Sequence, residues 1–261
     1  MTTSQKNSEK NKIEGGSGEI MYSNVKKDTI FHIHTYRCGH ASLEPDVLYV
    51  KKAIELGAKQ IVFTDHCPFP ENSFPWRMKY ESLPEYVSSL KQLRDEFQDK
   101  IDIKIGLEAE YFPSYDWYYE ELLNSGDFDL LILGQHIYEH EDGSFGYMDV
   151  TKEAEIKGFM KATLQGIRSG YFKVIAHPDR FLNRIEKWDE EADQIAKEIA
   201  KAAAETGVIL EKNISSMENG NLYSPEFWKN IPESIDIIYG LDAHSVEEME
   251  KFMFSLLNLL R

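Results

Sequence analysis

Short apolar segments rich in Ile, Val and Phe alternate with helical patterns from residue 29 to the end of the chain. Such segments are typical of strands that are buried on both faces of a parallel sheet. We therefore predict seven strands, at residues 29–34, 60–64, 101–107, 128–134, 173–177, 208–211 and 235–240.

The intervals between these strands carry helical patterns, which predict helices at residues 47–56, 83–97, 152–169, 190–205 and 246–260. Ser82 precedes Glu85 by three positions, and Ser245 precedes Glu248 likewise, so both pairs have the spacing of a capping box. Ser224–Pro225 indicates an N-cap followed by proline at the first helical position.

Seven strand-and-helix units predict an α/β fold in which the sheet forms a closed or nearly closed β/α barrel. We expect residues 29–261 to form this single domain, since 261 residues are enough for one sizeable core. Residues 1–28 differ in kind, because 1–19 are rich in Ser, Asn, Lys, Glu and Gly and lack an apolar segment. We expect a disordered leader there, either natural or added.

Composition narrows the classes of function. Lys and Arg total 29 against 45 acids, giving a net charge of −16 and no basic stripe, so a nucleic acid is a poor partner. No apolar run approaches the roughly 20 residues of a membrane helix, so we expect no membrane partner. Cys38 and Cys67 do not form a disulfide framework, and a cytoplasmic location fits best. The sequence gives no clear indication of oligomeric state.

Potential metal ligands gather where the predicted strands end, which is where chemistry collects in β/α barrels. Six of the seven strands end at or near such residues; the sixth, at Glu211, offers no obvious ligand. Imidazole and carboxylate groups suit divalent transition metals, so the pattern favours a metal-dependent hydrolase over a set of hydrogen-bonded core histidines. The expected ligands are His32, His34, His40, His66, Glu108, His136, His177, Asp242 and His244.

On these residues the chain resembles the polymerase-and-histidinol-phosphatase (PHP) superfamily over about residues 29–245. The resemblance implies a distorted seven-stranded (β/α)7 barrel that holds three divalent metal ions, usually zinc, manganese or iron. It implies one ion at His32, His34, Glu108 and Asp242. It implies a second at His40, His66 and His244, and a third at Glu108, His136 and His177.

Within this superfamily the chain looks most like the histidinol-phosphate phosphatase branch, on residues 74–78, 83–86, 106–113 and 177–180. The resemblance implies a phosphomonoesterase that acts on L-histidinol phosphate in histidine biosynthesis, so that its partner is a small phosphorylated substrate. Clustered divalent ions suit this reaction because they activate water and clamp phosphoryl oxygens. The alternatives are a phosphatase for protein phosphotyrosine or another small phosphomonoester, and a metal-binding module without turnover.

Other residues near the strand ends are candidates for catalysis and substrate binding. Asp65, His40 and a metal-bound water are candidates for protonating the leaving alcohol, and Asp65 can instead orient His66. Arg180, three residues past His177, can reach a phosphate with a bidentate fork. Three further substrate-binding candidates are Arg37, Lys212 and Glu110, the last through the cationic amine of histidinol.

Overall fold

The computed structural model describes residues 28–146, 151–185, 187–220 and 222–261. The predicted leader therefore lies outside the described residues, except for Asp28. The backbone carbonyl of Asp28 accepts hydrogen bonds from the N–H groups of Lys59 and Gln60, at 2.7 and 3.2 Å. The described chain thus begins directly before the first predicted strand.

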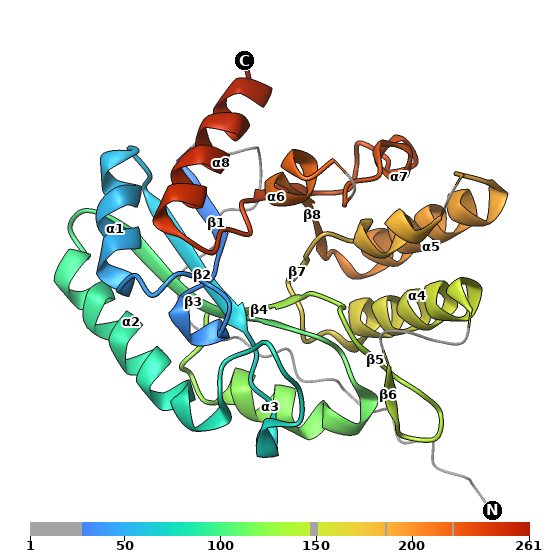
Figure 1. The fold of residues 1–261 in the computed structure, drawn as a ribbon, viewed down its shortest axis with the longest axis horizontal. Helices are drawn as coiled ribbons and strands as arrows, with labels where there is room; N and C mark the ends of the chain where they lie inside the picture. The colour runs from blue at the N-terminus through green and yellow to red at the C-terminus, as the bar shows by residue number, and fades with distance from the viewer. Residues whose placement is uncertain (1–27, 147–150, 186, 221) are drawn as a thin grey trace, which may run out of the picture.

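A seven-stranded parallel sheet forms the centre of the described chain (Figure 1). Its strands run in the order β1 (Thr29–Ile33), β2 (Gln60–His66), β3 (Asp102–Ala109), β4 (Leu130–Leu133), β7 (Val174–Ile175), β8 (Ile209–Asn213) and β9 (Ile237–Gly240). The residues after β9 return to β1, where Ile33 and Ala243 form a parallel bridge. Leu241 also donates its N–H to the carbonyl of Phe31 at 2.8 Å. The predicted barrel is confirmed, and a short β7 of two residues makes it irregular.

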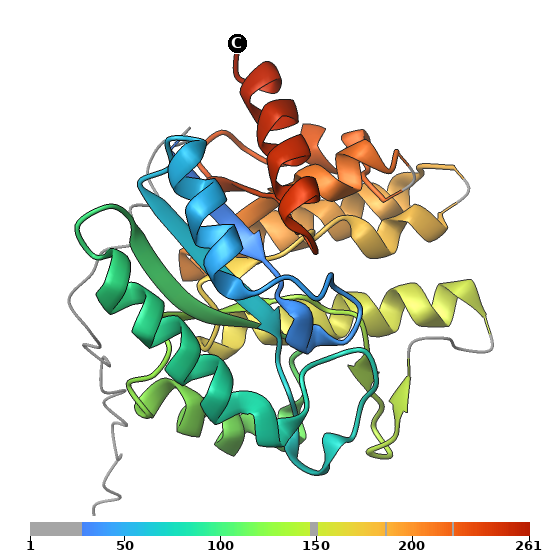
Figure 2. The same cartoon turned by 60° about the vertical axis from the view of Figure 1, so that its left-hand side comes forward.

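Helices surround this sheet, and Figure 2 shows α1 and α8 side by side on one flank. The five predicted helices are confirmed to within one residue at each end. They are α1 (Asp46–Glu55), α2 (Leu83–Phe97), α4 (Lys152–Ser169), α5 (Glu190–Thr206) and α8 (Val246–Leu259). The structure adds α3 (Asp116–Asn124), α6 (Ile214–Glu218) and a hairpin of β5 (Tyr138–Glu139) and β6 (Phe145–Gly146), and α7 (Pro225–Lys229) follows the predicted N-cap.

The predicted caps have different outcomes. Ser245 accepts a hydrogen bond from the Glu248 N–H at 3.0 Å, and Glu248 accepts one from the His244 N–H at 2.8 Å. The Ser82–Glu85 box is wrong, because Ser82 makes no side-chain cap bond and Glu85 binds Arg37 instead. Proline begins α7 directly after Ser224, as predicted.

Two apolar layers support the strand ends. The larger one lies between the sheet and the helices, and a smaller one fills the barrel interior. On β1, Ile30 and Ile33 belong to the outer layer, whereas Phe31 belongs to the inner one. The pairing of β1 with β2 shifts register between Phe31 and Ile33, at His32, whose φ is +68°. Because of this irregularity, the Phe31 side chain packs in the barrel interior, whereas the histidines lie toward the carboxyl end of β1. The inner layer is Phe31, Val62, Leu130, Ile132, Val174, Ala176 and Ile209.

Candidate metal centre

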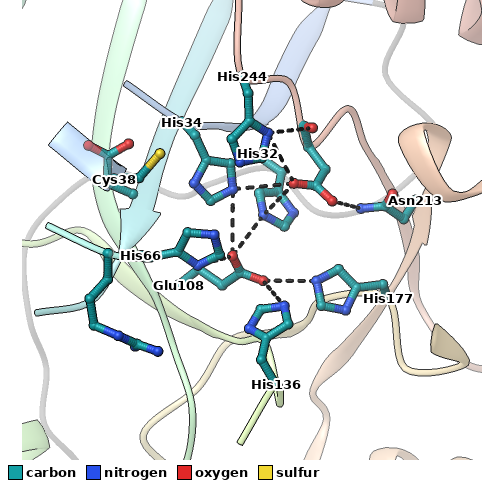
Figure 3. Close-up of polar contacts among 12 residues, drawn as sticks. His32, His34, Cys38, His66, Glu108, His136, His177, Asn213 and His244 are labelled. Atoms are coloured by element: carbon teal, nitrogen blue, oxygen red, sulfur yellow. Dashed lines mark hydrogen bonds and ion pairs between the residues drawn. The ribbon is translucent and has the colours of Figure 1, made fainter. Parts of the chain in front are cut away.

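The polar residues at the carboxyl ends of the strands converge at one end of the barrel (Figure 3). All nine predicted metal ligands belong to one continuous set of ion-pair and ring contacts there. The contacts join His32, His34, His40, His66, Glu108, His136, His177, Asp242 and His244.

Glu108, from β3, lies at the centre of the cluster and is 1% exposed. Its Oε2 atom lies 3.0 Å from His66 Nδ1, 3.4 Å from His32 Nε2 and 3.5 Å from His34 Nε2. Burial opposes the charge of Glu108, but the surrounding imidazoles hold the pKa of its carboxyl well below the usual range. An ionised carboxylate is therefore surrounded by nitrogen donors.

The other oxygen of Glu108 faces a second group of imidazoles. Its Oε1 atom lies 2.9 Å from His177 Nε2 and 3.8 Å from His136 Nε2. Gly134, directly after β4, leaves room for this carboxylate, because a Cβ there would lie 2.0 Å from Glu108 Oε1. Since its two oxygens face different imidazoles, Glu108 is placed to bridge two ions.

Asp242 supplies the second central carboxylate. Its Oδ1 atom lies 3.4 Å from His34 Nε2, and 3.8 Å from both His32 Nε2 and His244 Nδ1. Its Oδ2 atom accepts a hydrogen bond from Arg180 at 2.6 Å. Burial opposes its charge, but Arg180 and His32 hold the pKa of Asp242 well below its ordinary value.

The remaining imidazoles pack closely against one another. The rings of His34 and His244 are stacked with centroids 4.3 Å apart, and His40 lies 4.6 Å from His244 and 5.2 Å from His66. Burial and the neighbouring imidazoles lower the pKa of His34 well below its ordinary value and that of His40 to about 4. Their uncharged rings keep the lone pairs that metal ions require.

Several buried ligand atoms lack hydrogen-bond partners among the described residues. They are His32 Nε2, His34 Nε2, His244 Nε2 and Glu108 Oε2. Buried polar atoms are normally satisfied, and several orphans converging on one place indicate a missing partner. Imidazole nitrogens and carboxylate oxygens are ligands that divalent transition metals accept, so the residues fit such ions.

Three of these ligand residues have left-handed backbone conformations. The φ angles are +68° at His32, +34° at His177 and +52° at Asp242. Residues other than glycine rarely adopt such angles, which cost about 1–3 kcal/mol each and persist where the surroundings enforce them. Their coincidence with predicted ligands places the strain at the metal centre.

A cavity of about 510 Å³ opens beside the ligands and is lined in part by His40, Trp76 and Arg180. Besides Asp242, Arg180 binds Ser216 Oγ, at 2.9 Å from its Nη2 atom. Arg180 is thus held between a predicted metal ligand and the cavity.

Glu110 also lines this cavity, together with Arg77. Arg77 binds the Glu110 carboxylate through two contacts, at 2.7 and 3.1 Å, and His136 Nδ1 lies 3.4 Å from it. Burial opposes the charge of Glu110, but Arg77 and His136 lower its pKa to about 2. Sequence reasoning did not assign Arg77 a role, because it lies in a loop far along the chain from Glu110.

The other two substrate-binding candidates point elsewhere. Arg37 binds both oxygens of Asp46 at 2.9 Å and also binds Glu85, and it does not line the cavity. The turn after His34 directs its side chain toward α1 and α2. Lys212 lies with its Nζ 5.2 Å from the centroid of the Trp228 ring. Neither side chain lines the cavity, so the structure gives the predicted substrate-binding role of these two residues no support.

Asp65 is fully buried, and its carboxylate accepts hydrogen bonds from the backbone N–H and the hydroxyl of Thr35. Burial raises its pKa to about 7. It does not line the cavity, whereas His40 and His66 do. The position of Asp65 therefore favours a role in fixing the end of β1, which carries His32 and His34.

The sixth barrel strand does contribute to the site, through two residues that sequence reasoning missed. Glu211 is 0% exposed, and its Oε1 lies 2.6 Å from His32 Nδ1. Its Oε2 accepts hydrogen bonds from the His177 N–H at 3.0 Å and from Asn213 Nδ2 at 3.1 Å. The available signal was an acid directly after the apolar residues 208–210, at the same strand-end position as the predicted ligands.

The PHP domain family model matches residues 31–215. The chain belongs to the PHP domain family. A histidinol-phosphatase from Lactococcus lactis is 29% identical to this chain over 196 residues, and the match covers 70% of this chain and 70% of that relative. A Deinococcus radiodurans protein named "Probable histidinol-phosphatase" is 34% identical over 158 residues, and the match spans 57% of this chain and 59% of that relative.

The fold of the family is also found in a solved structure. It is that of histidinol phosphate phosphatase from Lactococcus lactis, complexed with zinc, L-histidinol and phosphate. Its TM-score is 0.64 at 24% identity, and the match covers 88% of this chain and 94% of that one. This likeness supports the PHP-type (β/α)7 barrel. Among the described residues of the present chain, no helix is long and apolar enough to span a membrane.

Proposed function

We propose that this protein is a metal-dependent phosphomonoesterase that hydrolyses L-histidinol phosphate to L-histidinol and phosphate. The observation that carries this proposal is the convergence of unpartnered imidazole and carboxylate atoms on Glu108, beside a cavity bordered by Arg180. The relatives named histidinol-phosphatase support the choice of substrate. Histidine biosynthesis in the cytoplasm would be the corresponding role.

The donor set provides for three divalent ions. The first would be held by His32, His34, Glu108 and Asp242, the second by His40, His66 and His244, and the third by Glu108, His136 and His177. Glu108 faces His32 with its Oε2 atom and His177 with its Oε1 atom, which supports its place in both the first and the third site. The zinc in the Lactococcus structure supports zinc, and the same donors accept manganese or iron.

Divalent ions bound at these residues would lower the pKa of a coordinated water and offset the charge of the phosphoryl oxygens. Arg180 would bind a phosphoryl oxygen from the cavity side while Asp242 and Ser216 hold its guanidinium in place. His40 lines the cavity, and its place among the ligands of the second ion would exclude it from protonating the leaving alcohol. Asp65 would act through Thr35 by fixing the end of β1.

The substrate is tested by steady-state kinetics. We would measure kcat/KM of metal-reconstituted enzyme for L-histidinol phosphate, a phosphotyrosine peptide and a generic aryl phosphate. We expect a value above roughly 10⁴ M⁻¹s⁻¹ for histidinol phosphate, well above the other two. The variant Glu108→Gln is the control for contaminating phosphatases and should lose this activity.

The alternatives predict different results. A higher value for the phosphotyrosine peptide would assign the enzyme to protein dephosphorylation. Equal values for histidinol phosphate and the aryl ester would retain phosphatase chemistry but refute the biosynthetic role. Bound metal without hydrolysis of any monoester would refute the enzyme and support a metal-binding module.

A further inference from the structure

Glu211 joins three strand ends through one buried carboxylate. It contacts the His32 ring near the end of β1, the His177 backbone N–H beyond β7, and Asn213 at the end of its own strand β8. Asn213 Nδ2 in turn lies 3.3 Å from Asp242 Oδ2, beyond β9. The pair Glu211–Asn213 therefore contacts ligands of both the first and the third proposed ion.

The predicted ligands that this pair contacts are also the predicted ligands with left-handed backbones among the described residues. His32, His177 and Asp242 are the predicted ligands with φ between +34° and +68° among the described residues. Each of them contacts Glu211 or Asn213. Because such conformations persist only where surrounding contacts enforce them, this pair is placed to hold the three ligands in position.

The fold makes room for the Glu211 carboxylate at Gly240, the last residue of β9. A Cβ at Gly240 would lie 1.7 Å from Glu211 Oε1 and 2.4 Å from its carboxyl carbon. Gly240 is not in a left-handed conformation, so its own backbone does not require glycine there. The need for glycine comes from the carboxylate beside it, as it does for Gly134 beside Glu108.

We infer that Glu211, assisted by Asn213 and accommodated by Gly240, is the positioning residue of the metal centre. Its contact with Nδ1 of His32 leaves Nε2 facing Glu108 and Asp242, where the first ion would lie. Its contact with the His177 N–H fixes the backbone of His177, which would be a ligand of the third ion. The inference rests on the proposed function in taking His32 and His177 as metal ligands.

Zinc affinity is the direct test, measured by competition with a chromophoric chelator on the full chain. Carboxylates that hold metal-binding histidines affect metal affinity about 10–100-fold. We expect Glu211→Gln to weaken zinc binding by this factor, and Gly240→Ala to do the same by displacing the carboxylate without removing it. Wild-type affinity in both variants would overturn the inference.

Asp129→Asn is the matched control. The Asp129 carboxylate accepts a backbone N–H from Ile105 at 2.8 Å and binds Arg94, but it precedes β4 and lies at the other end of that strand. This variant should lose a comparable carboxylate-to-backbone bond and keep its zinc affinity. Equal weakening in Asp129→Asn and Glu211→Gln would mean that general destabilisation explains the effect and would overturn the positioning role.

A measurement on the wild-type protein covers the case in which Glu211→Gln does not fold. In zinc-loaded protein labelled with ¹⁵N-histidine, His32 should carry its proton on Nδ1, with its signal assigned by its absence from the His32→Gln spectrum. A proton on Nε2 would overturn the inference. Zinc binding without phosphatase activity would refute the proposed function alone, and the affinities would still decide the role of Glu211.

Discussion

Arg180 shows how much a single side chain contributes to this site. Its guanidinium contacts Asp242, Ser216 and Asn213, and its side chain is 24% exposed. These three partners fix the orientation of a planar donor whose geometry suits phosphate. A lysine in the same place would supply charge without the fork that makes several contacts at once.

Replacing Arg180 with alanine should lower kcat/KM for histidinol phosphate by roughly tenfold or more, because a charge-assisted contact to the phosphoryl group is lost. Steady-state kinetics measures the effect. Arg168→Ala, which removes an exposed arginine from the last turn of α4, is the control and should behave as wild type. Unchanged kinetics for Arg180→Ala would exclude Arg180 from the substrate site.

For single residues, the sequence predicted the strand end at which a residue lies better than it predicted the direction of the side chain. The nine ligand candidates lie at or after the carboxyl ends of apolar strands, so the barrel brings them together. Arg37 and Lys212 also follow strands, yet both are directed away from the cavity. Lys212 alternates with Glu211 and Asn213 along β8, and this two-residue period decides which side chains face the interior. Contacts between distant segments, such as that of Arg77 with Glu110, could be identified only from the folded structure.

At the scale of elements, α8 links the stability of a helix to the position of a ligand. Ser245 caps the helix by accepting the Glu248 N–H, and Glu248 accepts the His244 N–H one residue before the cap. The start of this C-terminal helix therefore holds the loop that carries His244. Unlike a standard capping box, the acid reaches past the cap residue to the ligand.

Ser245→Ala should lower the free energy of unfolding by about 1 kcal/mol, since the helix loses a side-chain cap. Urea denaturation of the metal-free protein measures this change. Ser88→Ala is the control, because Ser88 is exposed within α2 and, among the described residues, its hydroxyl bonds only the Glu85 carbonyl. Its effect should stay within about 0.5 kcal/mol. Equal stability losses in the two variants would contradict the capping role.

The long helices could be predicted from their periodicity, but several short elements could not. Helix α3 is rich in aromatic residues, and two of them are buried through contacts with distant segments: Tyr118 donates to the Pro68 carbonyl, and Tyr119 packs on Tyr171 and Phe172. The β5–β6 hairpin lies within a segment that showed no strand pattern, and Phe145 packs there on Phe74 and Phe112. Tertiary packing, rather than local propensity, determines these elements.

At the scale of the whole molecule, barrel closure and the metal centre depend on the same residues. Ala243 pairs with Ile33 to close the barrel, and each has predicted ligands as its sequence neighbours. An ion at His32, His34 and Asp242 would therefore link the first strand to the segment after the last one. The PHP family membership and the unpartnered ligand atoms agree that divalent metal completes this part of the fold.

Removing metal should therefore lower thermal stability as well as abolish activity. An ion that binds only the folded state stabilises it by about 2.7 kcal/mol at 100 times its dissociation constant. We expect EDTA treatment followed by dialysis to lower Tm by several degrees and eliminate hydrolysis of histidinol phosphate, and added zinc to restore both. In Glu108→Gln, the same treatment should change Tm much less, because both Glu108-containing sites are weakened. An unchanged Tm and activity in protein shown by elemental analysis to be metal-free would refute the metal centre, because the unpartnered imidazoles would then need no ion.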